Sequence, residues 1–146
     1  MGFKISTGNI VGLPNQNIES LTNDILLVEK IQPEMVSASP FIPAETTPLN
    51  NASYGNIDQT LNTLAIYRKI LPTSLIPTVS ALEYYPDKGQ LKGFNAGANV
   101  ITINFTPNSN NFPIYATNRL KVKYDHAIET IKKAGFENVW INSFYL

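Results

Sequence analysis

Short runs of apolar and β-branched residues alternate along the chain with longer segments in which apolar residues recur every three or four positions. The first run, Lys4 to Val11, predicts a strand that ends at the turn Gly12-Leu13-Pro14-Asn15. The helix predicted next has its apolar stripe at Ile18, Leu21, Ile25 and Val28. Asn17 is the expected N-cap of this helix, with Asn15 as the alternative.

The same alternation then repeats. Further strands are expected over Met35 to Ser39, Leu75 to Val79 and Val100 to Asn104, and further helices over Ile57 to Ile70, Asp87 to Asn95 and Leu120 to Ala134. Asn56 or Asp58 can cap the second helix, and Gly97 and Gly135 follow two helices as C-caps. Val139 to Phe144 is either a final strand or a docking tail. This order predicts an α/β fold with parallel strands, about four βα units and hence half of a TIM-type barrel.

A half-barrel leaves one apolar sheet face and two strand edges uncovered. A second copy of the chain, a separate N-terminal half or the C-terminal tail would have to close it. We expect residues 1–146 to form a single domain, with the βα units in residues 1–107 and a C-terminal helix and tail in residues 108–146.

Charge and composition exclude several classes of function. The 146 residues carry 11 basic and 11 acidic side chains, so nothing indicates binding to nucleic acid or to an anionic membrane. No window approaches the roughly eighteen apolar residues of a transmembrane helix, and the first ten residues lack the pattern of a signal peptide. We therefore expect a cytoplasmic protein with no nucleic-acid or membrane partner.

The chain contains no cysteine and a single histidine. Without thiolates it cannot form disulfides, bind zinc through cysteine, hold an iron–sulfur cluster on its own residues or use a cysteine nucleophile. His126 lies beside Asp125 in a predicted helix, has no second ligand at motif spacing and is expected at a surface position. No residue is therefore assigned as catalytic and no metal site is predicted.

Four groups of residues, read in order, carry a resemblance to a known family. They are Gly2 to Pro14; Pro40-Phe41-Ile42-Pro43 with Thr47-Pro48-Leu49; Leu71-Pro72 with Ile76-Pro77; and Ala96-Gly97-Ala98-Asn99-Val100 with Thr106-Pro107. Together they resemble the C-terminal half of radical S-adenosylmethionine enzymes of the biotin synthase-like group, nearest the [FeFe]-hydrogenase maturase and methylornithine synthase branches. The resemblance is loose beyond residue 107.

The resemblance implies strands five to eight of a TIM-type barrel. In that family the N-terminal half carries a Cys-x3-Cys-x2-Cys loop whose [4Fe-4S] cluster cleaves S-adenosylmethionine to a radical. Because Gly2 matches the glycine before the family's fifth strand, the chain is expected to be a fragment, a split gene product or a half-barrel descendant. Alone it is expected to be inactive, and a cluster would require a separate half that supplies the cysteines.

The resemblance also assigns cofactor contacts. The glycine-rich motif of the fifth strand, which packs against the adenosine of S-adenosylmethionine, corresponds to Gly8, Asn9, Ile10, Gly12, Leu13 and Pro14. Phe41, Ile42 and Pro43 correspond to the adenosine-contacting end of the sixth strand. The residues alone are as compatible with structural roles as with adenosine contact. The glycine motif also suits a tight strand-to-helix turn, and the proline segment also suits a stiff loop that ends a strand. Any binding of S-adenosylmethionine by this chain is expected to be weak or vestigial.

Substrate contacts are expected at two further strand ends. Thr78 and Ser80 end the third predicted strand, and Asn104 and Thr106 end the fourth, where the active sites of barrels lie. Thr78 stands where biotin synthases carry an arginine of their second cluster, which disfavours the biotin synthase reaction. Polar residues at strand ends also serve as caps, and Glu83 is expected to be a solvated loop carboxylate.

Three hypotheses remain open. The chain is the C-terminal half of a radical S-adenosylmethionine enzyme that a separate cluster-bearing half completes, with a small-molecule substrate. Alternatively, it is a non-catalytic half-barrel that binds a small metabolite as a homodimer. The third is a nonfunctional truncated product that folds.

Overall fold

The computed structural model describes residues 2–105 and 120–137 of the chain. Strands and helices alternate along it in the order β1 (Ser6–Val11), α1 (Ile18–Ile31), β2 (Met35–Pro40), α2 (Ile57–Ile70), β3 (Pro77–Thr78), the 3-10 helix η1 (Ser80–Tyr84), α3 (Gly89–Asn95), β4 (Val100–Ile101) and α4 (Tyr124–Lys133). The chain has an α/β fold with parallel strands, as the sequence predicts.

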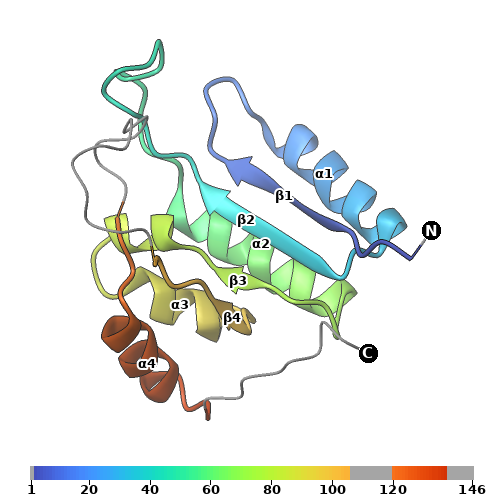
Figure 1. The fold of residues 1–146 in the computed structure, drawn as a ribbon. Helices are drawn as coiled ribbons and strands as arrows, with labels where there is room; N and C mark the ends of the chain where they lie inside the picture. Colours follow the sequence, from blue (N-terminus) through green and yellow to red (C-terminus); the bar gives the residue numbers. More distant parts are fainter. Residues whose placement is uncertain (1, 106–119, 138–146) are drawn as a thin grey trace.

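The strands form two parallel pairs. In the first pair Ser6 lies opposite Met35 and Val11 opposite Pro40, while in the second Pro77 lies opposite Val100. A parallel bridge between Met35 and Leu75 connects the pairs. Figure 1 shows the four strands side by side in chain order, so their carboxyl ends lie along one edge.

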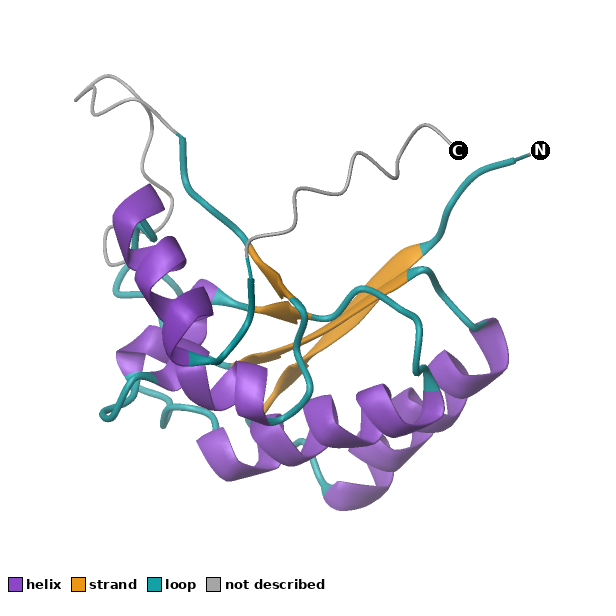
Figure 2. Ribbon diagram, turned by 90° about the horizontal axis from the view of Figure 1, so that it is seen from below, coloured by secondary structure: helices purple, strands orange, loops and turns teal. Residues whose placement is uncertain are grey.

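Helices α1, α2 and α3 cover one face of the strands (Figure 2). Period-two alternation in β1 and β2 explains why the apolar side chains of that face are buried. Val11, Val36 and Ala38 are fully buried against the helices, whereas Ile10 on the other face is 46% exposed. The core between strands and helices is completed by Leu21, Val28, Leu64, Tyr67, Leu71, Ile76, Leu82, Phe94 and Ala98.

The ends of the helices follow the sequence signals. The Asn17 side chain accepts the Ser20 N–H at 2.8 Å, and the Asn56 side chain accepts the Gln59 N–H at 3.0 Å, which confirms both predicted N-caps. Gly97 follows α3 with a φ of +109°. Within the described ranges, no helix has the length and apolar character that crossing a membrane requires.

Several boundaries differ from the prediction. Strands β3 and β4 pair over two residues each and not over five, since Leu75 makes only an isolated bridge. Helix α3 begins at Gly89 because Asp87 and Lys88 adopt positive φ. The helix predicted from Leu120 begins at Tyr124, because the Val122 carbonyl accepts the Asn104 N–H at 2.9 Å and keeps that segment outside the helix. The predicted final strand at 139–144 lies outside the described residues.

Candidate functional site

The first part of the candidate site lies where β1 ends. Gly12 has a φ of +87°, and its N–H donates to the Gln16 side chain at 2.6 Å. The Gln16 amide in turn donates to the Ile10 carbonyl at 2.9 Å, which closes the turn. A Cβ on Gly12 would lie 2.5 Å from the Cα of Gly55. The turn therefore requires glycine both for its backbone conformation and for its close packing.

Gly55 joins this turn to the end of β2. Its N–H donates to the Phe41 carbonyl at 2.8 Å, and the Phe41 N–H donates to the Val11 carbonyl at 2.8 Å. The Tyr85 hydroxyl donates to the Gly55 carbonyl. Two predicted cofactor residues, Gly12 and Phe41, are thus brought together by Gly55, which sequence reasoning did not single out because its partners lie far from it in the chain.

The other predicted cofactor residues of β1 are divided between the two faces of the sheet. Gly8 and the half-exposed Ile10 lie on the face opposite the helices. A Cβ on Gly8 would lie 2.6 Å from the Ser37 carbonyl oxygen, so the neighbouring strand alone explains this glycine. The Asn9 side chain points to the helix layer, where its amide donates to Asp24 at 3.2 Å. Strand alternation thus places the Asn9 side chain away from Gly8 and Ile10.

A second part of the candidate site is a cavity of about 390 Å³ at the carboxyl ends of β3 and β4. Its lining residues are Ser80, Thr102, Ile103, Asn104, Phe105, Leu120 and Val122. Two predicted substrate residues, Ser80 and Asn104, therefore share one cavity. All of these lining side chains are uncharged, and the hydroxyl and amide groups among them can form hydrogen bonds with a ligand.

Of the remaining predicted substrate residues, the structure describes only Thr78, which is not among the described residues that line this cavity. Thr78 is fully buried, and its hydroxyl donates to the Gln90 carbonyl in α3 at 2.8 Å. Its side chain therefore lies on the helix side of the strands, and its contact with substrate stays a prediction. Thr106 lies outside the described residues.

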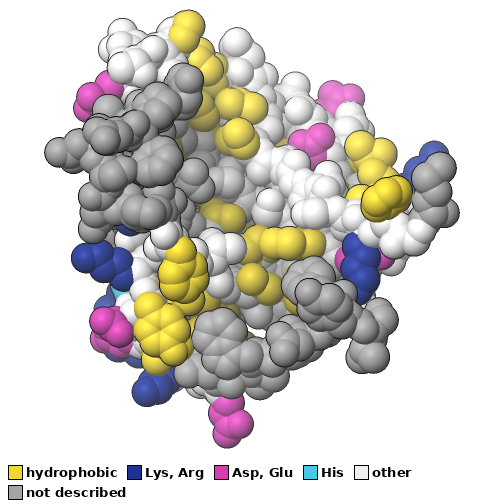
Figure 3. Space-filling view, in the orientation of Figure 1, with side chains coloured by type: hydrophobic (Ala, Val, Ile, Leu, Met, Phe, Trp, Pro, Cys, Tyr) yellow, Lys and Arg dark blue, Asp and Glu magenta, His cyan; other side chains and the backbone are white. Residues whose placement is uncertain are grey.

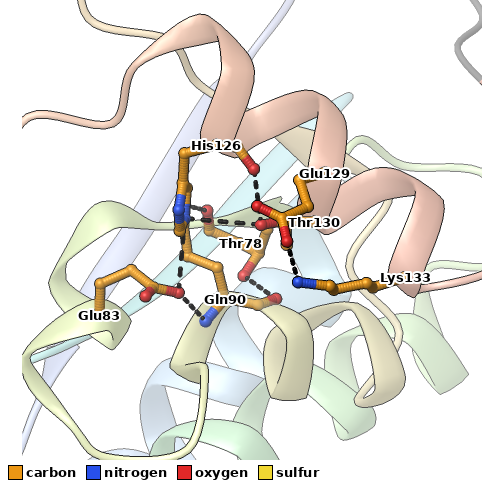
Figure 4. A network of polar contacts seen from close by, with 7 residues as sticks. All are labelled: Thr78, Glu83, Gln90, His126, Glu129, Thr130 and Lys133. Atoms are coloured by element: carbon orange, nitrogen blue, oxygen red, sulfur yellow. Dashed lines mark hydrogen bonds and ion pairs between the residues drawn. The ribbon is translucent and has the colours of Figure 1, made fainter.

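A polar network that connects η1, α3 and α4 corrects one further expectation (Figure 4). Glu83 is not a solvated loop carboxylate: its side chain is 19% exposed and accepts the Gln90 N–H at 2.8 Å. His126 lies at the surface of α4, as expected, with its side chain 42% exposed, and its Nε2 lies 3.1 Å from the buried Gln90 side-chain oxygen. Sequence reasoning missed Gln90 because an isolated glutamine carries no motif.

Burial raises the pKa of one tyrosine of the core strongly. Tyr67 is fully buried, and burial together with the charge of Asp24 raises the pKa of its hydroxyl to about 12. Neither the Tyr67 hydroxyl nor the Asn9 side-chain oxygen has a hydrogen-bond partner among the described residues. Tyr67 is therefore neutral at physiological pH and does not act as a base.

The donor set does not suit an iron–sulfur cluster or a transition metal. A [4Fe-4S] cluster is held by thiolates, and the chain has no cysteine. In the described part of the chain, no three His, Asp or Glu side chains converge on a common point. The cavity, whose described lining side chains are uncharged, and the glycine turn are suited to binding an organic ligand by hydrogen bonds and apolar contact.

Comparison with known proteins gives the family. The model of the biotin and thiamin synthesis associated (BATS) domain matches residues 37–137. The chain belongs to the BATS domain family. The match begins within β2 and extends past α4, so this BATS domain includes the 390 Å³ cavity and the network around Gln90.

Curated relatives of this BATS domain include enzymes and enzyme-maturation proteins. The [FeFe] hydrogenase maturase subunit HydE of Thermotoga maritima is 38% identical over 107 residues, 73% of this chain and 31% of the relative. The 3-methylornithine synthase of Methanosarcina acetivorans is 34% identical over 69% of this chain and 28% of the relative. The biotin synthase of Acinetobacter baylyi is 33% identical over 67% of this chain and 30% of the relative.

The fold has a solved counterpart. Methylornithine synthase (PylB) superposes on 98% of this chain with a TM-score of 0.74 and 22% sequence identity, and the match covers 43% of that structure. At 22% identity, this similarity shows only that the two proteins share a fold. The chain spans less than a third of the length of each of the three curated relatives. The activities in their names are those of the much longer relatives.

Proposed function

We propose that this chain is the C-terminal portion of a radical S-adenosylmethionine enzyme of the biotin synthase-like group, which contributes strand ends that contact adenosine and substrate. The observation that carries the proposal is the arrangement of two features at the carboxyl ends of parallel strands. The Gly12 turn is packed against the end of β2, and the cavity that holds Ser80 and Asn104 lies at the ends of β3 and β4.

The proposed architecture is half of a TIM-type barrel. Helices α1 to α3 lie on one face of the strands, which is how helices surround a barrel, and the other face would be the barrel interior (Figure 2). Figure 3 views that other face, where hydrophobic and uncharged atoms occupy the middle and most charged side chains lie near the rim. A separate N-terminal half with a Cys-x3-Cys-x2-Cys loop is the proposed partner, because it would supply both the missing strands and the thiolates.

In this proposal the adenosine of S-adenosylmethionine contacts the open face around Gly8, Ile10 and Gly12 and the strand end at Phe41 to Pro43. The substrate occupies the cavity beside Ser80 and Asn104. The amino and carboxylate groups of S-adenosylmethionine would normally bind the cluster, so this chain alone retains only the adenosine contacts. Without the bonds to the cluster, S-adenosylmethionine loses several kcal/mol of binding free energy. Each 1.4 kcal/mol lowers the affinity about tenfold, so we expect a dissociation constant in the millimolar range.

The second candidate is a non-catalytic half-barrel that binds a small metabolite, as a homodimer. The uncharged cavity of about 390 Å³ favours it, because that volume suits a small organic ligand without any cluster. The two candidates differ in what they bind: the first requires adenosine recognition at the β1 end, and the second requires only the cavity.

Calorimetry with S-adenosylmethionine and with 5′-deoxyadenosine tests the proposal. We expect both to bind weakly and alike, and Ile10→Asp on the open face to weaken both by at least tenfold. Leu27→Asp is the matched control, because Leu27 is 55% exposed on α1 in the helix layer. Absence of binding by both compounds at about ten millimolar would reduce the Gly12 turn to a structural element and leave the metabolite-binding candidate.

A further inference from the structure

The cavity has walls from three separate parts of the chain. The first, Ser80, belongs to η1, and the second, residues 102–105, follows β4. The third wall, formed by Leu120 and Val122, precedes α4. Near the cavity, a backbone hydrogen bond from the Asn104 N–H to the Val122 carbonyl, at 2.9 Å, connects this third wall to the segment after β4. Because α4 begins two residues after Val122, the position of this wall relative to Ser80 also depends on how α4 is attached to the rest of the fold.

Gln90 in α3 is fully buried, and each of its polar groups has a partner. Its N–H donates to Glu83 at 2.8 Å, its carbonyl accepts the Thr78 hydroxyl at 2.8 Å, and its side-chain amide donates to the Thr78 carbonyl at 3.0 Å. These contacts leave the side-chain oxygen facing His126 in α4, at 3.1 Å from Nε2. Because that oxygen can only accept, His126 must carry a hydrogen on Nε2.

His126 also lies near the carboxylate that receives the Gln90 N–H. Its Nε2 is 3.8 Å from a Glu83 oxygen, and the backbone carbonyl of His126 accepts the Thr130 hydroxyl at 2.8 Å within α4. One imidazole thus connects α4 with both α3 and η1, as Figure 4 shows. Since η1 carries Ser80 and α4 follows Leu120 and Val122, this network is attached to two of the three walls of the cavity.

We propose that His126 is a positioning residue: its hydrogen bond to Gln90 holds α4 against α3 and η1, and so holds the wall formed by Leu120 and Val122 opposite Ser80. The inference rests on the proposed function, in which this cavity receives the small-molecule substrate. The competing explanation is that apolar contacts alone hold α4, because Ala127 is fully buried and the Phe94 and Phe136 rings lie 5.6 Å apart. That explanation makes His126 dispensable.

The first measurement is the tautomer of His126 in the unmodified chain. Because this is the only histidine, the imidazole ¹⁵N spectrum has a single ring system to assign. We expect the Nε2–H tautomer in the folded chain at neutral pH. This measurement requires no variant and no ligand. A predominant Nδ1–H form would overturn the proposal.

The second measurement is hydrogen exchange of the Asn104 amide, which reports opening of the cavity wall. We expect His126→Leu to accelerate this exchange about tenfold, the effect of losing one hydrogen bond to a buried acceptor. His126→Gln keeps an N–H donor and should restore exchange to within about twofold. Lys132→Ala is the control, because Lys132 is an exposed residue of α4 that takes no part in the network around Gln90.

Equal exchange rates in the His126→Leu and unmodified chains would overturn the proposal, as would a His126→Gln variant that behaves like His126→Leu. Both measurements use the chain without ligand, so a failure here leaves the adenosine-binding test unaffected. Conversely, absence of nucleoside binding would remove the proposed enzymatic role of the cavity. The exchange of the Asn104 amide would still report whether His126 positions the cavity wall formed by Leu120 and Val122.

Discussion

Gly12 and Gly55 are in contact through their backbones, at a distance that leaves no room for a side chain on Gly12. Gly12 directly follows β1, and Gly55 lies in the segment between β2 and α2 that comes back to the end of the sheet. Their contact explains why two glycines that are 43 positions apart, one before α1 and one before α2, belong to the same structural feature. The carboxyl edge at β1 and β2 is built around it.

We predict that Gly12→Ala strongly destabilises the chain. The left-handed conformation at a φ of +87° costs a residue with a Cβ about 1–2 kcal/mol, and the clash with Gly55 adds about 1–3 kcal/mol. The free energy of unfolding in urea measures the sum.

Gly135→Ala is the matched control for Gly12→Ala. Gly135 has a φ of +79°, but a Cβ there would meet no atom within 4 Å. It should show the conformational cost alone, so equal destabilisation by the two substitutions would mean that the contact with Gly55 is relaxed in solution.

The second prediction concerns pH and Tyr67, whose pKa is raised to about 12 by burial and by Asp24. In the unfolded chain the hydroxyl ionises near pH 10. The folded form therefore holds the proton more tightly, so its stabilising contribution is complete below pH 10 and is lost as the pH rises through about 12. We expect the urea midpoint to fall over that range.

Comparison with Tyr67→Phe isolates this effect from other tyrosines, including Tyr85, whose pKa is also raised by burial. The variant lacks the ionisable hydroxyl at position 67 and should lose less stability between pH 10 and 12. At neutral pH its stability should be close to that of the unmodified chain, because the Tyr67 hydroxyl has no partner among the described residues. Parallel pH profiles for both proteins would show that the hydroxyl is hydrated.

The sequence predicts the local features of this fold well. Asn17 and Asn56 cap their helices through the amide three residues ahead, so the signal and its partner lie in one short segment. The alternation of strands and helices is likewise local, and it indicated the parallel arrangement. Strand lengths were overestimated at β3 and β4, because the extent of a strand depends on its neighbour and not on its own residues.

The parts of the candidate site that escaped prediction depend on contacts between distant segments. Gln90 and His126 are 36 positions apart, and neither has a partner at motif spacing. The side-chain direction of Asn9 follows from strand register, which sequence pattern alone left open. Ser80 and Asn104 share one cavity because both lie near the ends of neighbouring strands, where position along the chain determines position in the fold; their contact with substrate stays a prediction.

The third prediction is that the purified chain stays colourless after anaerobic treatment with iron and sulfide. It has no cysteine, and thiolates are the ligands of such clusters. Iron and sulfide analysis together with the visible spectrum measures the outcome, and a cysteine-ligated ferredoxin treated in parallel controls for the procedure. Stoichiometric iron and sulfide that remain after gel filtration would require ligands other than cysteine.

The last prediction is that the chain associates with itself when no partner half is present. Among the described strands β1 pairs with β2 alone, so its other edge has no strand beside it, and Ser6, Gly8 and Ile10 carry no charge that would oppose pairing. Light scattering should show a mass that rises with concentration. Ile10→Lys places a charge on the open face and should shift the chain toward monomer, whereas Leu27→Lys, on the helix layer and similarly exposed, should not. A monomer at every concentration would mean that the open face and the β1 edge are covered within one chain, and that no second half is needed to close them.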